Sequence, residues 1–255
     1  MVSELMLQQT QVTRVIPKYM NFLERFPTPQ ECSQASPALI IEAWEGLGYN
    51  RRALNLHRAA SIIVDSYGGV VPDSLDQLLQ LPGIGPYTAR AILCFAYEKD
   101  IGVVDVNTKR VISRIVGELL PPQELQKRAD ELVPQGQGWI WNQALMDLGS
   151  GICKARVVDC ANCPLKKFCS WRGEGSDPVA YRNKPKRISI KFEGSDRQGR
   201  GRLINVLRKR LVVSSELEEV MGWKGDPKRC ERVVSGLIKD GLVECNTKKE
   251  YSLPS

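Results

Sequence analysis

Apolar residues recur at helical spacing along most of the first two-thirds of the chain. Leu5, Val12 and Val15 are separated by polar positions, and Pro17 suits the first turn of a following helix. No segment before residue 185 alternates apolar and polar residues as a half-buried strand does. The pattern predicts an all-α region with helices at residues 4–14, 17–26, 38–47, 50–67, 74–81, 87–97, 105–116, 124–132 and 139–148.

The last part of the chain has a different pattern. Short amphipathic segments predict helices at residues 202–210, 215–221 and 227–240, and residues 242–245 and 250–253 are suited to pair as a hairpin. Three helices followed by a hairpin are typical of a winged helix, a module that binds DNA or proteins. The third helix mixes basic and acidic residues, so its charge does not decide between these two partners.

Composition narrows the class of protein. The chain has 255 residues, of which 42% are hydrophobic and 25% charged, as in ordinary globular proteins. Its longest apolar run, residues 91–97, is too short to cross a bilayer, and residues 1–4 show no secretory signal. We therefore expect a cytoplasmic protein without membrane contact.

The net charge of +7 is concentrated in one segment. Residues 182–210 carry eleven Lys and Arg against Glu193 and Asp196, which gives a local charge of +9. Such a segment suits a linker with a phosphate-binding surface, and it equally suits a solvated linker.

Four of the eight cysteines are clustered, with the spacing C-x6-C-x2-C-x5-C. Disulfides between them would close only very small loops, and nothing indicates an oxidising compartment, so a metal site is the better interpretation. The spacing favours an iron–sulfur cluster over zinc, which usually takes two short cysteine pairs, but it leaves both open. The four residues are Cys153, Cys160, Cys163 and Cys169.

Three other features each allow a structural and a functional interpretation. Residues 81–85 (LPGIG) form either a simple helix–helix corner or a turn whose backbone N–H groups bind a DNA phosphate. Asp105 is placed to cap the next helix, and Glu4 lies in a first turn where the helix dipole favours a carboxylate.

These motifs occur together and in one order: residues 3–10 (SELMLQQT), 46–49 (GLGY), 81–85, 104–107 (VDVN) and the cysteine loop. Over about residues 1–175 the sequence resembles the helix-hairpin-helix base-excision DNA glycosylases with an iron–sulfur cluster, and in particular the MutY-type adenine glycosylases. The resemblance implies an all-α, two-lobed glycosylase with a small winged-helix-like C-terminal domain. The expected domains are a helical barrel lobe at 1–100, a lobe with a [4Fe-4S] cluster loop at 101–175, a basic linker at 176–200 and the winged-helix-like domain at 201–255.

The resemblance also assigns chemistry. It implies a monomeric, nucleoid-associated enzyme that removes adenine mispaired with 8-oxoguanine or guanine from double-stranded DNA. Glu4 matches the acid that protonates adenine N7, and Asp105 matches the carboxylate that stabilises the oxocarbenium-like transition state. Asn107 matches an orienting residue. The four clustered cysteines match the [4Fe-4S] ligands.

Residue 87 indicates whether the DNA strand is cut after the base is removed. Tyr87 stands in the pocket lining where endonuclease III-like relatives carry a lysine that forms a Schiff base, so strand cleavage is not expected. Gln9 and Tyr49 match residues that wedge into the duplex when the adenine is extruded. The remaining expected contacts to DNA or the flipped base are Gln8, Gly83, Gly85 and Asp147.

Some residues depart from the family pattern. Relatives have one or two helices before the position of Glu4, so we expect part of the pocket to be open. Val106 replaces a usual glycine and Asn50 a frequent second tyrosine, which leaves the opposite-base preference open. Two alternatives stand beside the adenine hypothesis: a thymine or uracil glycosylase for T·G mismatches on the same scaffold, and a non-catalytic iron–sulfur DNA-binding regulator.

Overall fold

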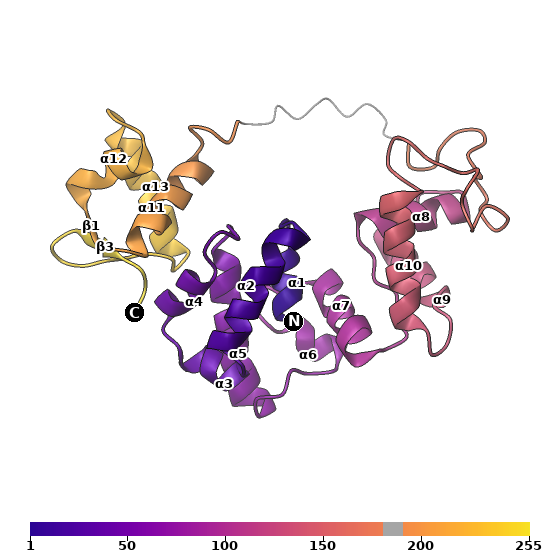
Figure 1. Ribbon diagram of the computed structural model, residues 1–255, viewed down its shortest axis with the longest axis horizontal. Coiled ribbons are helices and arrows are strands. Elements are labelled where there is room, and N and C mark those ends of the chain that lie inside the picture. Colours follow the sequence, from indigo (N-terminus) through magenta and orange to yellow (C-terminus); the bar gives the residue numbers. More distant parts are fainter. Residues whose placement is uncertain (181–190) are drawn as a thin grey trace. The chain divides into compact units, whose positions relative to one another are not determined.

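A computed structural model describes residues 1–180 and 191–255 of the chain. The protein is mostly helical, as predicted, and has a small sheet near its C-terminus (Figure 1). Contacts divide the described residues into two compact units: unit 1 comprises residues 1–72, 81–83 and 191–255, and unit 2 comprises residues 73–80 and 84–180. In the described part of the chain, no helix has the length and apolarity needed to cross a membrane.

The first part of unit 1 is a group of five helices around an aromatic core. Phe22 and Trp44 are almost fully buried and meet edge to face with ring centroids 6.2 Å apart. Prolines in the first turns of two helices follow the N-caps Thr28 and Ser36, whose hydroxyls accept backbone N–H groups. The helices are α1 (Val2–Leu7), α2 (Val12–Arg25), α3 (Pro29–Gln34), α4 (Pro37–Ala43) and α5 (Arg51–Tyr67).

The second part of unit 1 is the C-terminal region, drawn in orange and yellow in Figure 1. Its three strands form an antiparallel sheet in the order β1-β3-β2, with Val212 opposite Tyr251 and Glu244 opposite Ser252. The elements are α11 (Asp196–Leu207), β1 (Val212–Val213), the 3-10 helix η1 (Ser214–Glu216), α12 (Leu217–Met221), α13 (Pro227–Lys239), β2 (Glu244–Cys245) and β3 (Glu250–Ser252).

This C-terminal region shares a core with the preceding helices of unit 1. Ile41 of α4 and Leu54 of α5 belong to the same buried cluster as the apolar residues of α11–α13. The guanidinium of Arg208 donates to the carbonyl of Ile41 at 3.1 Å and to Oδ1 of Asn50 at 3.2 Å. Removing the C-terminal region would therefore expose apolar surface and leave polar groups without partners.

Unit 2 is built on five helices, of which α8 and α10 approach closely. A Cβ added at Gly149 would lie 2.9 Å from Cβ of Asn107, so only glycine permits this approach. Asn142 of α10 accepts from the backbone N–H of Val103 at 2.7 Å and so fixes the strand-like segment before α8. The helices are α6 (Leu75–Leu79), α7 (Pro86–Tyr97), α8 (Val106–Val116), α9 (Pro122–Glu131) and α10 (Gly138–Gly151).

Several predicted element boundaries are wrong, among them the end of the helix expected at residues 38–47, since α4 ends at Ala43. The helix expected at residues 4–14 breaks at Gln9, whose φ is +56°. Helix α2 then runs through Pro17 instead of beginning there, because Val15 and Phe22 bury one continuous apolar face on both sides of the proline. The last error is at α11, which begins at Asp196 and not at residue 202, since the Ser195 hydroxyl accepts the backbone N–H of Gln198 and caps the helix.

The two compact units differ in outline from the expected domains. Helix α7, expected in the lobe at 1–100, groups with α8–α10 in unit 2. Helix α11 begins inside the segment expected as a linker at 176–200, and residues 181–190 of that linker lie outside the described residues. Helix α3 was not predicted, because it has six residues with only Cys32 buried, so its signal is its capping box and not an apolar period.

Ile41→Ala should lower the free energy of unfolding by about 2–5 kcal/mol, because Ile41 is fully buried in the core shared with the C-terminal region. Val70→Ala is the matched control, since that side chain is exposed, and it should change stability by less than about 0.5 kcal/mol. Urea unfolding followed by tryptophan fluorescence measures both. Equal stability of the two variants would contradict the shared core.

Candidate active site

Glu4 lies in the first turn of α1, next to the fully buried Leu5 and Met6. Burial raises the pKa of its carboxyl above the ordinary value, and the charged amino group of Met1 acts in the opposite direction. A raised pKa keeps a carboxyl protonated to higher pH, which is what a proton donor requires. The burial of the Glu4 carboxyl could not be predicted from the local sequence.

Two loops of unit 1 carry the other residues predicted at its surface. Gln9, after α1, and Tyr49, before α5, are both exposed and both have left-handed backbone, with φ of +56° and +46°. They line one open cavity of about 540 Å³ together with Gly46 and Gly48. The structure therefore brings together the two residues that were predicted to act as wedges, from segments about forty residues apart in sequence.

Gln8 contributes its backbone to this arrangement. Its carbonyl accepts from Nη1 of Arg52 at 2.7 Å, while Nη2 of Arg52 donates to the carbonyl of Gly48 at 3.2 Å. Arg52 is only 8% exposed and was not predicted as a site residue. Nothing in its local sequence separates it from the exposed Arg51 beside it.

Asp105 caps α8, as its sequence position indicated. Oδ1 accepts from the backbone N–H groups of Asn107 at 2.8 Å and Thr108 at 2.7 Å, and Oδ2 accepts from Nδ2 of Asn107 at 3.1 Å. Thr108 Oγ1 in turn accepts from the Asp105 N–H at 2.7 Å and completes a capping box. These bonds fix the carboxyl in one orientation at the positive end of the helix.

Asn107 is itself held by a residue that sequence did not indicate. Arg110, which is buried, donates from Nη2 to Oδ1 of Asn107 at 2.9 Å and to the carbonyl of Gly149 at 2.6 Å. Its Nε donates to the carbonyl of Cys153 at 2.9 Å. A single arginine thus connects the Asp105 cap to the end of α10 and the start of the cysteine loop.

Tyr87 and Asp105 line the same open cavity in unit 2, which has a volume of about 760 Å³. Arg90 and Lys109 add positive charge to its lining. Asn107 and Asp147 do not line it, and Asp147 is exposed on α10. Two of the four predicted catalytic residues therefore meet in one cavity, whereas Glu4 belongs to unit 1.

The two glycines of the LPGIG turn have different reasons to be glycine. Gly83 has φ of +80°, and an added Cβ would lie 2.9 Å from Cβ of Asn55. Gly85 is the N-cap of α7 with extended backbone, and an added Cβ would meet nothing within 4 Å. Folding therefore requires glycine at position 83, and position 85 leaves the backbone of the first turn of α7 open to approach.

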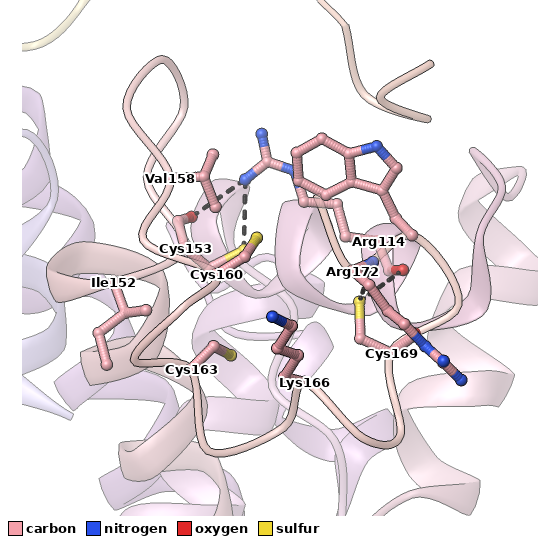
Figure 2. A pocket seen from close by; sticks show the side chains of 10 residues that line it. Arg114, Ile152, Cys153, Val158, Cys160, Cys163, Lys166, Cys169 and Arg172 are labelled. Atoms are coloured by element: carbon pink, nitrogen blue, oxygen red, sulfur yellow. Dashed lines mark hydrogen bonds between the residues drawn. The ribbon is translucent and has the colours of Figure 1, made fainter. Parts of the chain in front are cut away.

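The four clustered cysteines surround one small cavity in the loop after α10, and Figure 2 shows their thiols around this hollow. Arg114 lines the same cavity and donates from Nη1 to Sγ of Cys153 at 3.2 Å. Among the described residues, no three potential ligands have the arrangement that would hold a single metal ion. In a [4Fe-4S] cluster each thiolate binds a different iron, so the ligands surround a shared space instead of meeting at one point.

Arg114 also anchors the loop to α8. Its guanidinium donates to both carboxylate oxygens of Asp177, at 3.1 and 2.6 Å, and to the carbonyl of Lys154 at 2.8 Å. The ring of Trp171 packs against it, 4.7 Å from the guanidinium carbon. The side chain is 1% exposed, so this is a buried, paired cation that fixes both ends of the cysteine loop.

Two of the other cysteines, Cys32 and Cys94, are buried away from this loop. Burial raises the pKa of Cys32 and of Cys94 to about 11, and both lie in the cores of their units. Such thiols are inert packing residues.

The sequence is similar to those of known base-excision DNA repair proteins. A family model described as "HhH-GPD superfamily base excision DNA repair protein" matches residues 2–135. The "Adenine DNA glycosylase" of Mycolicibacterium smegmatis is 40% identical over 257 residues, which cover 99% of this chain and 86% of the relative.

Two solved structures are similar over a smaller part of the chain. A thermostable thymine-DNA glycosylase has a TM-score of 0.64 and 31% identity, over 68% of this chain and 82% of its own. Endonuclease III in a non-covalent complex with DNA has a TM-score of 0.60 and 23% identity over the same shares, which supports the fold alone.

Gly83→Ala should destabilise the protein by at least about 1–2 kcal/mol, because alanine in left-handed backbone is strained and its Cβ would collide with Asn55. Gly85→Ala makes the same chemical change two residues away, where space is open, and should cost less than about 1 kcal/mol. Thermal unfolding of both variants decides the point. A larger loss of stability for Gly85→Ala than for Gly83→Ala would contradict this difference between the two glycines.

Proposed function

Because the chain belongs to the MutY-type adenine DNA glycosylases of the HhH-GPD superfamily, we propose that it excises adenine mispaired with 8-oxoguanine or guanine in double-stranded DNA. The observation that carries the proposal is a match to an adenine DNA glycosylase along 99% of the chain, which includes the C-terminal region. The similarity to the solved thymine-DNA glycosylase covers only 68% of this chain. An enzyme with this substrate works at the nucleoid.

Adenine leaves a deoxyribose only when it is made a better leaving group. In the proposed reaction Glu4 donates a proton to N7 of the extruded adenine, and the raised pKa of its carboxyl supports this assignment. Bond cleavage leaves positive charge on the sugar, and a fixed carboxylate close to that charge stabilises the transition state. Asp105 takes this part, since the cap bonds hold its carboxyl at the wall of an open cavity.

Asn107 has an orienting function in this proposal, because its amide donates to Asp105 and its own oxygen is held by Arg110. Tyr87 lines the cavity beside Asp105. A tyrosine has no amine to form a Schiff base with the sugar, so the enzyme stops at an abasic site and leaves the strand intact.

Extrusion of a base leaves a gap that side chains must fill. Gln9 and Tyr49 are exposed at the ends of two loops that share one cavity, which supports their use as wedges, with Gln8 beside them. Gly85 and the open first turn of α7 suit a backbone phosphate, with Gly83 shaping the turn. Asp147 is exposed on α10 and remains a proposed contact to the flipped adenine.

Members of this family often carry a [4Fe-4S] cluster, and the cysteine loop fits one. Cys153, Cys160, Cys163 and Cys169 line a common cavity, and Arg114 supplies a charged donor to one thiol. Such a cluster would cross-link the loop after α10 through four thiolates. In this proposal it has no part in the excision chemistry, which is assigned to the two carboxyls.

We assign the C-terminal region a winged-helix-like fold, because three helices and a three-stranded antiparallel sheet share one core. We keep residues 1–100, 101–175, 176–200 and 201–255 as the proposed domains. Because α4 and α5 share a core with α11, the C-terminal region should be tested within the full chain.

Two alternative functions can be separated by one set of substrates. Single-turnover excision is measured on duplexes with A·8-oxoG, A·G, T·G and U·G pairs. The proposal predicts adenine release from the first two. Release of thymine or uracil alone would support the T·G glycosylase, and binding without release of any base would support a non-catalytic regulator.

Glu4→Gln and Asp105→Asn should each slow adenine excision by at least ~10²-fold, because one removes the proton source and the other the negative charge beside the sugar. Both replacements keep size and hydrogen bonding, so affinity for the mismatch should be largely retained. Single-turnover kinetics and a gel-shift titration measure the two quantities. A fully active Asp105→Asn variant would defeat the assignment.

Excision should slow as pH rises through the pKa of Glu4, because only the protonated carboxyl donates. Burial raises that pKa, so the inflection should lie above the value of about 4.3 for a free glutamate. A pH profile of the single-turnover rate shows this limb, and Glu4→Gln should lack it. The same inflection in both proteins would assign the titration to another group.

Cys160→Ser should lose iron and the thiolate-to-iron absorption of the purified protein, whereas Cys245→Ser should keep both, since Cys245 is exposed in the C-terminal region. Metal analysis of anaerobically prepared protein is the measurement. Stoichiometric zinc without iron would overturn the cluster assignment.

A further inference from the structure

One buried arginine ties the two wedge loops together. From Arg52, Nη1 donates to the carbonyls of Leu5 at 2.6 Å, Met6 at 3.0 Å and Gln8 at 2.7 Å. Nη2 donates to Oγ1 of Thr10 at 3.1 Å, and to the carbonyls of Leu47 at 3.1 Å and Gly48 at 3.2 Å. The first set belongs to the end of α1 and the loop that carries Gln9, and the second joins this loop to the one that carries Tyr49.

The carbonyls that Arg52 binds lie at the end of a helix and in two loops, and that of Gly48 also accepts from Nε1 of Trp44 at 3.2 Å. The last carbonyls of a helix have no intrahelical donor, and a cation at that end is also favoured by the helix dipole. The next residue to be held, Gln9, has left-handed backbone, as does Tyr49. Such backbone costs roughly 1–2 kcal/mol per residue and persists only where surrounding bonds enforce it.

The guanidinium of Arg52 interacts with backbone carbonyls and aromatic rings of its own chain. The guanidinium packs against the rings of Trp44 and Tyr49, 5.5 and 5.6 Å from their centroids. No carboxylate pairs with Arg52 in the described part of the chain, and its Nε is buried without a hydrogen-bond partner. The carbonyl dipoles of the two loops are therefore its counter-charge, and the side chain is not available to a DNA phosphate.

We propose that Arg52 is the positioning residue for base extrusion: it locks the loops of Gln9 and Tyr49 in the conformation that enters the duplex. This inference rests on the proposed function and extends it to a residue that touches neither the adenine nor the sugar. Wedge insertion requires both side chains at once, and one guanidinium that bonds to both loops makes their positions interdependent.

The planar guanidinium is needed because it bonds in two directions. An ammonium offers three donors from a single nitrogen, whereas Arg52 places Nη1 on the loop of Gln9 and bonds with Nη2 to both loops. Arg52→Lys keeps the positive charge and most of the packing but cannot hold both sets of carbonyls. Arg58→Lys is the matched control, since Arg58 is exposed on the same helix.

The experiment compares two DNA substrates. One has A·8-oxoG in a continuous duplex, and the other has the same adenine inside a bubble of unpaired nucleotides, where little work is needed to extrude it. Arg52→Lys should slow single-turnover excision from the duplex by at least ~10-fold, the scale of a misplaced active-site loop, and from the bubble by less than about 3-fold. Arg58→Lys should match the unsubstituted protein on both.

A second readout does not depend on excision. With 2-aminopurine beside the mismatch, stopped-flow fluorescence follows unstacking of the duplex, which Arg52→Lys should slow by a similar factor. If the unsubstituted protein unstacks the duplex but excises no adenine from either substrate, the proposed function fails while the role of Arg52 stands.

Two results would overturn the role of Arg52. The first is an equal loss on duplex and bubble, which indicates general damage to the fold. The second is an unchanged rate of unstacking. If Arg52→Lys does not fold, Thr10→Val removes one acceptor of Nη2 at nearly constant volume, and it should slow the duplex reaction by about 3-fold without affecting the bubble. Equal rates on the duplex for Thr10→Val and the unsubstituted protein would also count against the proposal.

Discussion

Buried arginines that donate to backbone carbonyls hold the irregular parts of this protein in place. Arg52 binds the end of α1 and two loops, Arg110 binds the end of α10, and Arg114 binds the start of the cysteine loop. In each case the acceptors are carbonyls at a helix end or in a loop, and burying a carbonyl without a donor would cost about 1–3 kcal/mol. Gln8, Gln9, Tyr49 and the four clustered cysteines lie on these segments.

The same interactions explain why the carboxyl assigned to the sugar is rigid. Asp105 is bonded to Asn107, which Arg110 holds, and Arg110 also bonds to the carbonyl of Cys153 at the edge of the cysteine cavity. The Asp105 cap and the cysteine loop are therefore connected through the side chains of Asn107 and Arg110 on α8. A cross-linked loop would help to fix Arg110, and through it the cap, without entering the reaction.

Local sequence signals predicted the proposed site residues, whereas the long-range hydrogen bonds that hold their segments could not be predicted from the sequence. The cysteine spacing and the cap at Asp105 are readable because their partners lie within a few residues along the chain. Arg52 has acceptors 44–47 residues away, and an arginine in an amphipathic helix looks like a surface residue. The break at Gln9 was missed for the same reason, since bonds from this distant side chain enforce its left-handed backbone.

If adenine leaves only after protonation at N7, a substrate without that nitrogen should not react. Matched duplexes carry either adenine or 7-deazaadenine opposite 8-oxoguanine, and mass spectrometry follows the strand after a single turnover. We predict that adenine is lost from an otherwise intact strand, and that 7-deazaadenine is retained although the protein binds both duplexes. Loss of both bases at the same rate would contradict it.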